Sequence, residues 1–572
     1  MKFNFLNGEI TNIHSAAFIL GAAGLLSRLL GVLRDRLLAG QFGAGRELDV
    51  YYAAFQIPDF MALVFILGSG SAAILPIFQD VLSSDRAEAH KLISHLVTLF
   101  LLGAIVVAAG VFVFVPSLMF IIAPGFSESE QNLTILLTRI MLISPILLGL
   151  SSILSAVLQS YQRFFAFALA PILYNAGIIL GILIFTPIWG LAGLAVGVII
   201  GALLHFLVQF APTLSLGFAP HVKPHILRDS FTVFFRGPVT QVLKLSFPRF
   251  VSLSITRITS VVLVAIASTL APGSISIYKL ADNLFSVPVG VFGVSYAIAL
   301  FPKIHQAYLK KNGSLFCQEM FMGIRTILFW IIPFSILFLV LRAHIVRATL
   351  GAGVFSWEDT RLTAAVLGVL VLAMWAEGLG SLLIKGFYAL ESTWVPLFIN
   401  VATSVLGIIL AVLLTQALAA GGEFSNFATS VFRIKDLPNP EVLGLAAGFT
   451  IGLAVNIFCL YRALLKLTAE KFGVLELFPY GALGKIILAS VLAGIAAYGV
   501  RVSFSETLPL ITFARVLGQG AIAGGAGFLV YFLSLYFMKS EDMEAVARTV
   551  RRRIFKLGLL PRVWDSESIT HL

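Results

Sequence analysis

The stretch LVTLFLLGAIVVAAGVFVFVPSLMFII at residues 96–122 decides the fold class of this chain. It contains no charged residue, and it is longer than the roughly 20 apolar residues that an α-helix needs to cross a bilayer. A strand of a membrane β-barrel would instead alternate apolar and polar residues over about 10 positions. The stretch therefore predicts a transmembrane helix.

The whole chain, like this stretch, is rich in apolar residues and poor in charged ones. Of its 572 residues, 59% are hydrophobic and 12% are charged, and the mean hydropathy is +0.98. Because a soluble domain carries roughly 25% charged residues, this composition excludes a soluble enzyme, a disordered chain and a nucleic-acid-binding module. The two cysteines, Cys317 and Cys459, cannot form a disulfide framework, and the nine histidines show no metal-ligand spacing.

Apolar windows of about 19 residues recur along the chain and predict about 14 transmembrane helices. We therefore expect an all-α polytopic membrane protein. The N-terminal window is too long for a cleaved signal peptide and ends in charged residues. The windows lie at 15–38, 51–78, 93–121, 133–160, 165–186, 190–213, 240–270, 277–301, 321–341, 362–385, 394–419, 441–464, 483–503 and 512–537.

The distribution of lysine and arginine predicts the orientation of the chain. With both termini in the cytoplasm, the outer loops near 122–132, 187–189 and 271–276 hold no Lys or Arg, whereas most inner loops hold several. Two outer loops, at 342–361 and 420–438, do carry basic residues, so the rule is followed imperfectly. The net charge of +11 is then mostly a cytoplasmic collar that faces anionic inner-leaflet lipid rather than nucleic acid.

An internal repeat predicts two lobes. APILYNAGIIL at 170–180 matches VPLFINVATSV at 395–405 at an offset of 225 residues. Pro76 and Pro302, near the ends of two other windows, are 226 residues apart. Two matches at almost the same offset predict duplication of a six-helix unit, with a central cavity between the two lobes.

The repeat and the windows together predict the organisation of the chain. We expect an N-terminal lobe at 1–213, a cytoplasmic linker at 214–239, a C-terminal lobe at 240–469, two further helices at 470–537 and a basic cytoplasmic tail at 538–572. The tail is either an amphipathic helix on the inner surface or a plain flank of the last span. The protein is expected to be a monomer.

Charged residues inside the apolar windows are candidates for function, because a charge within the membrane must face a cavity or a partner. Arg28, Arg249, Arg257 and Lys279 lie in the first helices of the two predicted lobes, and Arg34 lies near the end of the first helix. Together they predict a cationic cavity with few carboxylates. Its expected ligand is an anion, and the fork of an arginine suits a phosphate group.

Local pairing of these cations is the alternative interpretation. Arg34 has Asp35 and Asp49 as candidate partners, and Lys279 has Asp282. In that case the carboxylates orient the cations and are not direct ligands of a substrate. The sequence has no Gly-rich phosphate loop of the Walker type, so we do not expect an ATPase.

Seven short motifs are spread in order along essentially the whole chain. They are SRLLGVLRD at 27–35, FGAG at 42–45, AAFQIPD at 53–59, APGF at 123–126, YQRFFAFALAP at 161–171, GVFGV at 290–294 and GFYALESTWVP at 386–396. These motifs resemble the MurJ/MviN family of lipid II flippases. The resemblance implies membership of the multidrug, oligosaccharidyl-lipid and polysaccharide exporter superfamily, with two six-helix lobes plus two helices.

The resemblance implies a transporter of the bacterial plasma membrane rather than an enzyme. It would move lipid II, the undecaprenyl-diphosphate-linked peptidoglycan precursor, from the cytoplasmic to the outer leaflet by alternating access, for cell-wall biogenesis and cell shape. The family's functional positions fall on Arg28, Arg34 and Asp49. No cofactor is expected. The membrane potential or Na⁺ bound at Asn400 and Thr403 could drive the cycle, although these two polar residues also suit plain helix packing.

The chain departs from the family pattern at three positions. Ala62 stands where the family has a basic residue, Leu67 where it has Glu, and Asn283 where it has Arg. We hypothesise that Lys279 and Arg257 restore the missing positive charge. The departures leave open a flippase for another lipid-linked oligosaccharide, such as an O-antigen unit. The excess of arginine disfavours a multidrug antiporter, and the short loops disfavour a membrane glycosyltransferase.

Overall fold

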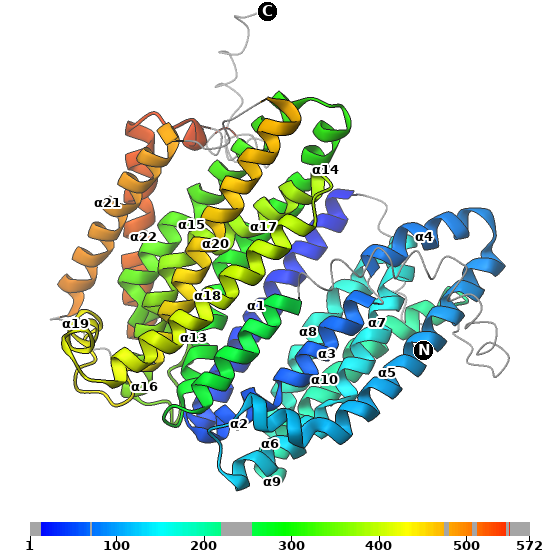
Figure 1. Ribbon diagram of the computed structural model, residues 1–572, viewed down its shortest axis with the longest axis horizontal. Helices are drawn as coiled ribbons and strands as arrows, with labels where there is room; N and C mark the ends of the chain where they lie inside the picture. The colour runs from blue at the N-terminus through cyan, green and yellow to red at the C-terminus, as the bar shows by residue number, and fades with distance from the viewer. Residues whose placement is uncertain are drawn as a thin grey trace, which may run out of the picture. The chain divides into compact units, whose positions relative to one another are not determined.

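The computed structural model describes residues 13–68, 71–218, 254–473, 480–505, 512–544 and 548. These residues form helices and no strands (Figure 1), which confirms the predicted all-α class. In chain order the helices are α1 (Ile13–Phe42), α2 (Arg46–Ala54), α3 (Gln56–Gly68), α4 (Ser71–Ser84), α5 (Arg86–Ile122), α6 (Glu128–Met141), α7 (Ile143–Ser160), α8 (Phe164–Leu180), α9 (Thr186–Trp189), α10 (Leu191–Ser215), the helix Ser254–Ser268, α13 (Ser274–Pro288), α14 (Ser295–Leu309), α15 (Gly313–Leu350), α16 (Trp357–Leu370), α17 (Met374–Ala389), α18 (Trp394–Ala419), α19 (Glu423–Phe432), α20 (Val442–Phe472), α21 (Tyr480–Ser505) and α22 (Phe513–Phe537).

Among the described residues, 12 helical stretches are long and apolar enough to cross a membrane. They coincide with all of the predicted windows except the first and the seventh. The first window corresponds to α1, in which Arg28 and the run Arg34, Asp35 and Arg36 interrupt the apolar sequence. The seventh lies partly outside the described residues and contains the shorter apolar helix Ser254–Ser268. The predicted count of about 14 is therefore not confirmed.

The chain forms two compact units: the first combines the N-terminal half of the sequence with two segments of the C-terminal half, and the second comes almost entirely from the C-terminal half. The predicted lobe boundaries at residues 213 and 240 do not coincide with this division, and they stay a prediction. Unit 1 consists of Met1–Leu284, Thr349–Val369 and Leu397–Gly452, and unit 2 consists of Phe285–Ala348, Leu370–Pro396 and Leu453–Leu572.

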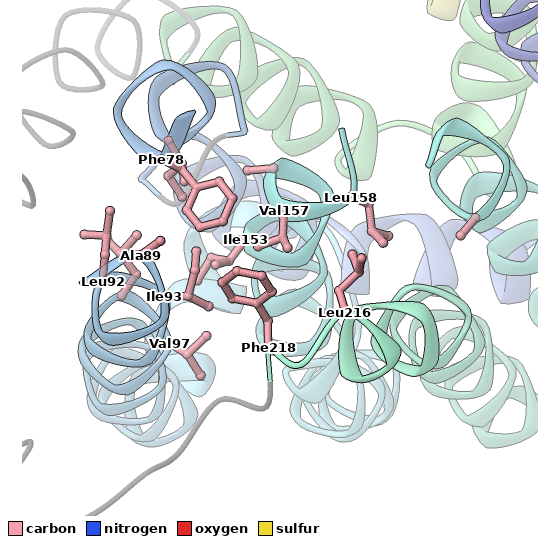
Figure 2. Packing of buried hydrophobic residues seen from close by; sticks show 14 of the residues in the cluster. Phe78, Ala89, Leu92, Ile93, Val97, Ile153, Val157, Leu158, Leu216 and Phe218 are labelled. Atoms are coloured by element: carbon pink, nitrogen blue, oxygen red, sulfur yellow. The ribbon is translucent and has the colours of Figure 1, made fainter. Parts of the chain in front are cut away.

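A buried aromatic residue holds together one end of the N-terminal helices in unit 1. Figure 2 shows Phe218, just beyond α10, among side chains of α4, α5 and α7 such as Phe78, Ile93 and Ile153. The Phe218 and Phe78 rings lie 5.6 Å apart at a steep angle, which is a favourable aromatic geometry. This apolar cluster fixes where α10 ends relative to the helices that precede it.

Close backbone contact joins α8 and α10 in unit 1. A π-helical turn, Gly181–Phe185, follows α8 and lies against α10. A Cβ atom built on Gly197 would lie 2.5 Å from the Cα of Gly181 and 3.2 Å from the carbonyl oxygen of Gly177. Because only glycine leaves room for such an approach, small residues at this spacing are typical of packed membrane helices.

The same contact recurs between α18 and α20, also in unit 1. A Cβ atom built on Gly452 would lie 2.8 Å from the Cα of Gly407 and 3.2 Å from the carbonyl oxygen of Thr403. Gly407 and Thr403 each follow their counterparts in the first pair, Gly181 and Gly177, by 226 residues. This is the offset that separates Pro76 from Pro302, so the packing supports the duplication predicted from the sequence.

We expect Gly197→Ala and Gly452→Ala to destabilise the protein by about 1–3 kcal/mol each, because the added methyl group collides with backbone atoms that have no rotamer to change. Thermal unfolding of the purified protein in detergent measures the loss. Gly103→Ala in α5 is the matched control, since a Cβ atom there meets nothing within 4 Å. Equal melting temperatures for all three variants would contradict the close contact.

Candidate functional site

A chain of polar contacts links α1 to two other helices of unit 1. On α1, the Arg34 guanidinium donates to Oδ1 of Asp35 from Nε at 3.0 Å and from Nη2 at 2.8 Å. Its Nη1 donates to Oδ1 of Asn175 on α8 at 3.3 Å. The other oxygen of Asp35 accepts from Nδ2 of Asn283 on α13 at 2.9 Å. Asp35 thus orients Arg34, as the local-pairing interpretation expects, and ties α1 to α13.

Asn175 is held in place by its own helix and by α1. Its Nδ2 lies 3.1 Å from the carbonyl oxygen of Pro171 and 3.4 Å from both Oγ and the carbonyl oxygen of Ser27. These acceptors fix the amide so that its oxygen faces Arg34. Sequence reasoning used Asn175 only as a marker of the repeat, and the repeated Pro-x-x-x-Asn pattern is the signal that could have shown its importance.

A second, more open group of charges involves α3, α13 and the helix Ser254–Ser268. Oδ2 of Asp59 on α3 lies 3.5 Å from Nη1 of Arg257, and both side chains are nearly half exposed, at 45% and 48%. Lys279 on α13 donates from Nζ to Oγ of Ser260 at 2.7 Å. Asp59 also interacts electrostatically with Lys279 and Arg34, which connects the two groups of charges.

The cations of this region are accompanied by carboxylates. Asp282, one turn after Lys279 on α13, attracts Lys279 and Arg257 electrostatically. The cationic cavity stays a prediction, and a hydropathy window does not show which carboxylates accompany its cations. The members that attract one another are the cations Arg34, Arg257 and Lys279 and the carboxylates Asp35, Asp59 and Asp282.

Asp49 lies with its Oδ2 4.0 Å from Nη1 of Arg46 on its own helix, and it holds the start of α13. It is 1% exposed. Its Oδ2 accepts from the backbone N–H of Gly273 at 2.6 Å, and its Oδ1 accepts from the backbone N–H and the hydroxyl of Ser276 at 2.8 and 2.6 Å. A carboxylate at a helix N-terminus satisfies free N–H groups and favours the helix dipole. Asp49 therefore positions α13, the helix that carries Lys279 and Asn283.

The remaining predicted residues lie outside these contacts or outside the described residues. Arg28 is partly exposed on α1, about two turns before Arg34. Arg249 lies outside the described residues. On α18, the hydroxyl of Thr403 donates to the carbonyl oxygen of Ile399 at 2.8 Å, within its own helix. Among the described residues, no group of three or more His, Cys, Asp or Glu side chains is placed to hold a metal ion.

The structure describes the side chains of two of the three residues at which the chain departs from the family pattern. Asn283 uses its amide to bind Asp35. Ala62 lies one turn after Asp59 on α3, and Asp59 pairs with Arg257. Compensation of the missing charge by Arg257 and Lys279 stays a prediction. The side chain of Leu67 lies outside the described residues.

We expect Asp49→Ala to lower the free energy of unfolding by about 1–3 kcal/mol, because it leaves buried N–H groups of Gly273 and Ser276 without an acceptor. Thermal unfolding in detergent measures the change. Asp80→Ala is the control, since Asp80 is an exposed aspartate on α4. An unchanged melting temperature for Asp49→Ala would contradict a positioning role.

Comparison with known proteins places the chain among lipid flippases. A family model described as lipid II flippase MurJ matches residues 38–518. The probable lipid II flippase MurJ of Thermotoga maritima is 27% identical over 533 residues, which cover 93% of this chain and 98% of that protein. The probable lipid II flippase MurJ of Borreliella burgdorferi is 29% identical over 391 residues, or 68% of this chain and 74% of that protein.

A solved structure has the same fold. The structure described as lipid II flippase MurJ, inward closed conformation, superimposes with a TM-score of 0.70 and 24% sequence identity. The match covers 91% of this chain and 99% of that one. The likeness extends over nearly all of both chains and shows a shared fold.

Proposed function

The chain belongs to the lipid II flippase MurJ family, and from this membership we propose that it carries lipid II across the bacterial plasma membrane by alternating access. The family model matches most of the chain, and this observation carries the conclusion. The protein is a multi-pass membrane transporter, with 12 candidate spans among its described residues. The relatives named above are lipid II flippases, so they do not favour an O-antigen flippase.

The charged cluster of unit 1 is the proposed binding site for the diphosphate of the headgroup. Arginine donates paired hydrogen bonds to phosphate oxygens, and lysine adds a mobile positive charge. Arg257 is the best placed of the described cations to change partners, because its ion pair with Asp59 is half exposed and long. Exposed ion pairs of this kind contribute little stability, so a diphosphate can replace the Asp59 carboxylate at small cost.

The other predicted residues have different roles in the proposed site. Arg28 and Arg34 supply charge from α1, and Arg249 would supply it from the predicted seventh span. Asn283 acts through Asp35, which it binds directly. Asp49 is a positioning residue and not a ligand, since its oxygens already accept three hydrogen bonds from protein donors.

The balance of charge suggests how the cycle is driven. When carboxylates neutralise the cations of the empty site, the empty protein moves little net charge across the membrane. The loaded protein moves the negative headgroup outward, and a cytoplasm-negative potential favours this by ~2.3 kcal/mol per charge per 100 mV. The proposed driving force is therefore the membrane potential. Na⁺ at Asn400 and Thr403 is the alternative, in which a lone pair of the Thr403 hydroxyl oxygen would coordinate the ion while its O–H still donates to the carbonyl oxygen of Ile399.

The proposed orientation has both termini in the cytoplasm. The short loops near 122–132, 187–189 and 271–276 would then lie outside and carry no Lys or Arg. The basic residues of the inner loops would face anionic lipid of the inner leaflet. The headgroup would accordingly enter from the cytoplasmic side and leave on the outer side.

We expect the chain to restore growth to bacteria depleted of their lipid II flippase, and we expect Arg28→Ala to fail. The reason is that Arg28 lies on α1, the first span predicted from the sequence, and would supply charge for the diphosphate. Arg139→Ala is the control, because Arg139 stacks on Phe112 with its guanidinium 4.6 Å from the ring centre, away from the cluster. Rescue by Arg28→Ala equal to the parent would contradict the proposed site.

We expect the double change Arg257→Ala and Lys279→Ala to abolish rescue in the same assay, because it removes the cations that replace the family's missing charge. Asp59→Asn is the matched control: it removes the competing carboxylate, keeps both cations, and should retain transport. Membrane extracts must contain each variant at the parent's level. Normal growth with the double variant would contradict the compensation hypothesis.

A further inference from the structure

A short helix lies between two membrane-spanning helices of unit 1. It is α19, Glu423–Phe432, and it begins four residues after α18 ends at Ala419. Four extended residues span at most about 14 Å, so α19 must begin close to the level at which α18 leaves the bilayer. Its position is therefore set by the chain itself.

The surface of α19 is divided into three faces, as a helix with about 100° between successive residues allows. One face, with Ser425 and Thr429, is buried against the protein. A second face is polar and exposed, and it carries Asn426 and Ser430. The third face is apolar and exposed: Phe424, Phe427 and Val431 are 47%, 68% and 53% exposed.

Two side chains hold the segment after α19 against α16. Nη1 and Nη2 of Arg361 each lie 2.6 Å from an oxygen of Asp436. Nη2 also donates to the carbonyl oxygen of Arg433, at the C-terminal end of α19. A bidentate arginine–carboxylate pair fixes orientation as well as distance. The faces of α19 therefore have a defined direction and do not rotate freely.

The apolar face of α19 follows in sequence a helix that also has exposed apolar residues. Ile409 and Leu413, in the C-terminal half of α18, are exposed, as expected for a helix that faces lipid. At and beyond the C-terminal end of α19, Arg433 and Lys435 are exposed, and lipid phosphates attract such side chains. The segment thus combines apolar side chains suited to acyl chains with basic side chains suited to the phosphates, which lie between the acyl chains and water.

We propose that α19 is an interfacial helix whose partner is the phospholipid bilayer. Phe424, Phe427 and Val431 lie at the boundary between headgroups and acyl chains, Asn426 and Ser430 face water, and Arg433 and Lys435 bind lipid phosphates. A helix of this type anchors a segment in the plane of the membrane. Here it anchors the connection between α18 and α20, which form the second of the two repeated glycine contacts. The proposal does not depend on the transported substrate.

Collision measurements with a spin label test this assignment. The full chain is reconstituted in phosphatidylcholine vesicles containing phosphatidylglycerol, with Cys317→Ala and Cys459→Ala to remove the only native thiols. Single labels are placed with Phe427→Cys and Val431→Cys on the apolar face, and with Asn426→Cys and Ser430→Cys on the polar face. Oxygen, which partitions into lipid, should collide severalfold more with the first pair than with the second, and a water-soluble nickel chelate should show the reverse.

Matched positions on one helix make the result independent of how much protein is correctly oriented. Growth rescue by the thiol-free chain shows that the background is folded. Equal access of the nickel chelate to residues 426 and 427 would overturn the proposal, because α19 would then project into water. Protection of residue 427 from both reagents would also overturn it, since another protein surface would then cover the apolar face.

Discussion

A charge inside the hydrocarbon of a membrane needs an opposite charge, a dense set of hydrogen bonds or water beside it, and this constraint organises unit 1. Arg34 meets Asp35 on the same helix, and Arg257 meets Asp59 across helices. The contact between Asp35 and Asn283 then draws α1 and α13 together. Helices that are distant in sequence are thus fixed by polar contacts, while their apolar faces remain free to meet lipid. The same contacts place cations where a charged headgroup can be bound.

Packing between glycines supplies the rigidity that such a site requires. Between membrane helices there is little hydrophobic driving force, so close backbone approach and dispersion contacts must hold them together. The pairs Gly197–Gly181 and Gly452–Gly407 provide this approach twice, and Gly181 and Gly407 are separated by the repeat offset. Because a close-packed contact does not deform continuously, each of the two helix pairs, α8 with α10 and α18 with α20, can act as a rigid body where its glycines meet. Alternating access needs parts of this kind, which move as units and keep their internal structure.

Hydropathy and spacing predict much of this architecture and little of its polar detail. The apolar windows located the spans because the cost of exposing backbone groups to lipid acts over every turn of a helix. The first window is not apolar enough to count among these spans, because α1 carries charged residues such as Arg28 and Arg34 within its apolar sequence. The contact from Asp49 to Gly273 joins residues more than 200 positions apart and follows no periodicity, so the sequence carried no sign of it. The involvement of Asn175 was visible only as a repeated motif of unknown meaning.

Two ion pairs in the same cluster differ in a way that separates a structural role from a binding role. The pair between Arg34 and Asp35 is short, uses two donors on one oxygen and is shielded from solvent. Breaking it would leave a buried charge unpaired, which is costly. The pair between Arg257 and Asp59 is longer and half exposed, so water can solvate the charge of either side chain when the two separate. In the proposed binding site, an entering diphosphate would therefore displace Asp59 before Asp35. The buried pair would then keep the helices in register while the exposed pair exchanges its anion, so that one cluster could hold the fold together and still release its ligand.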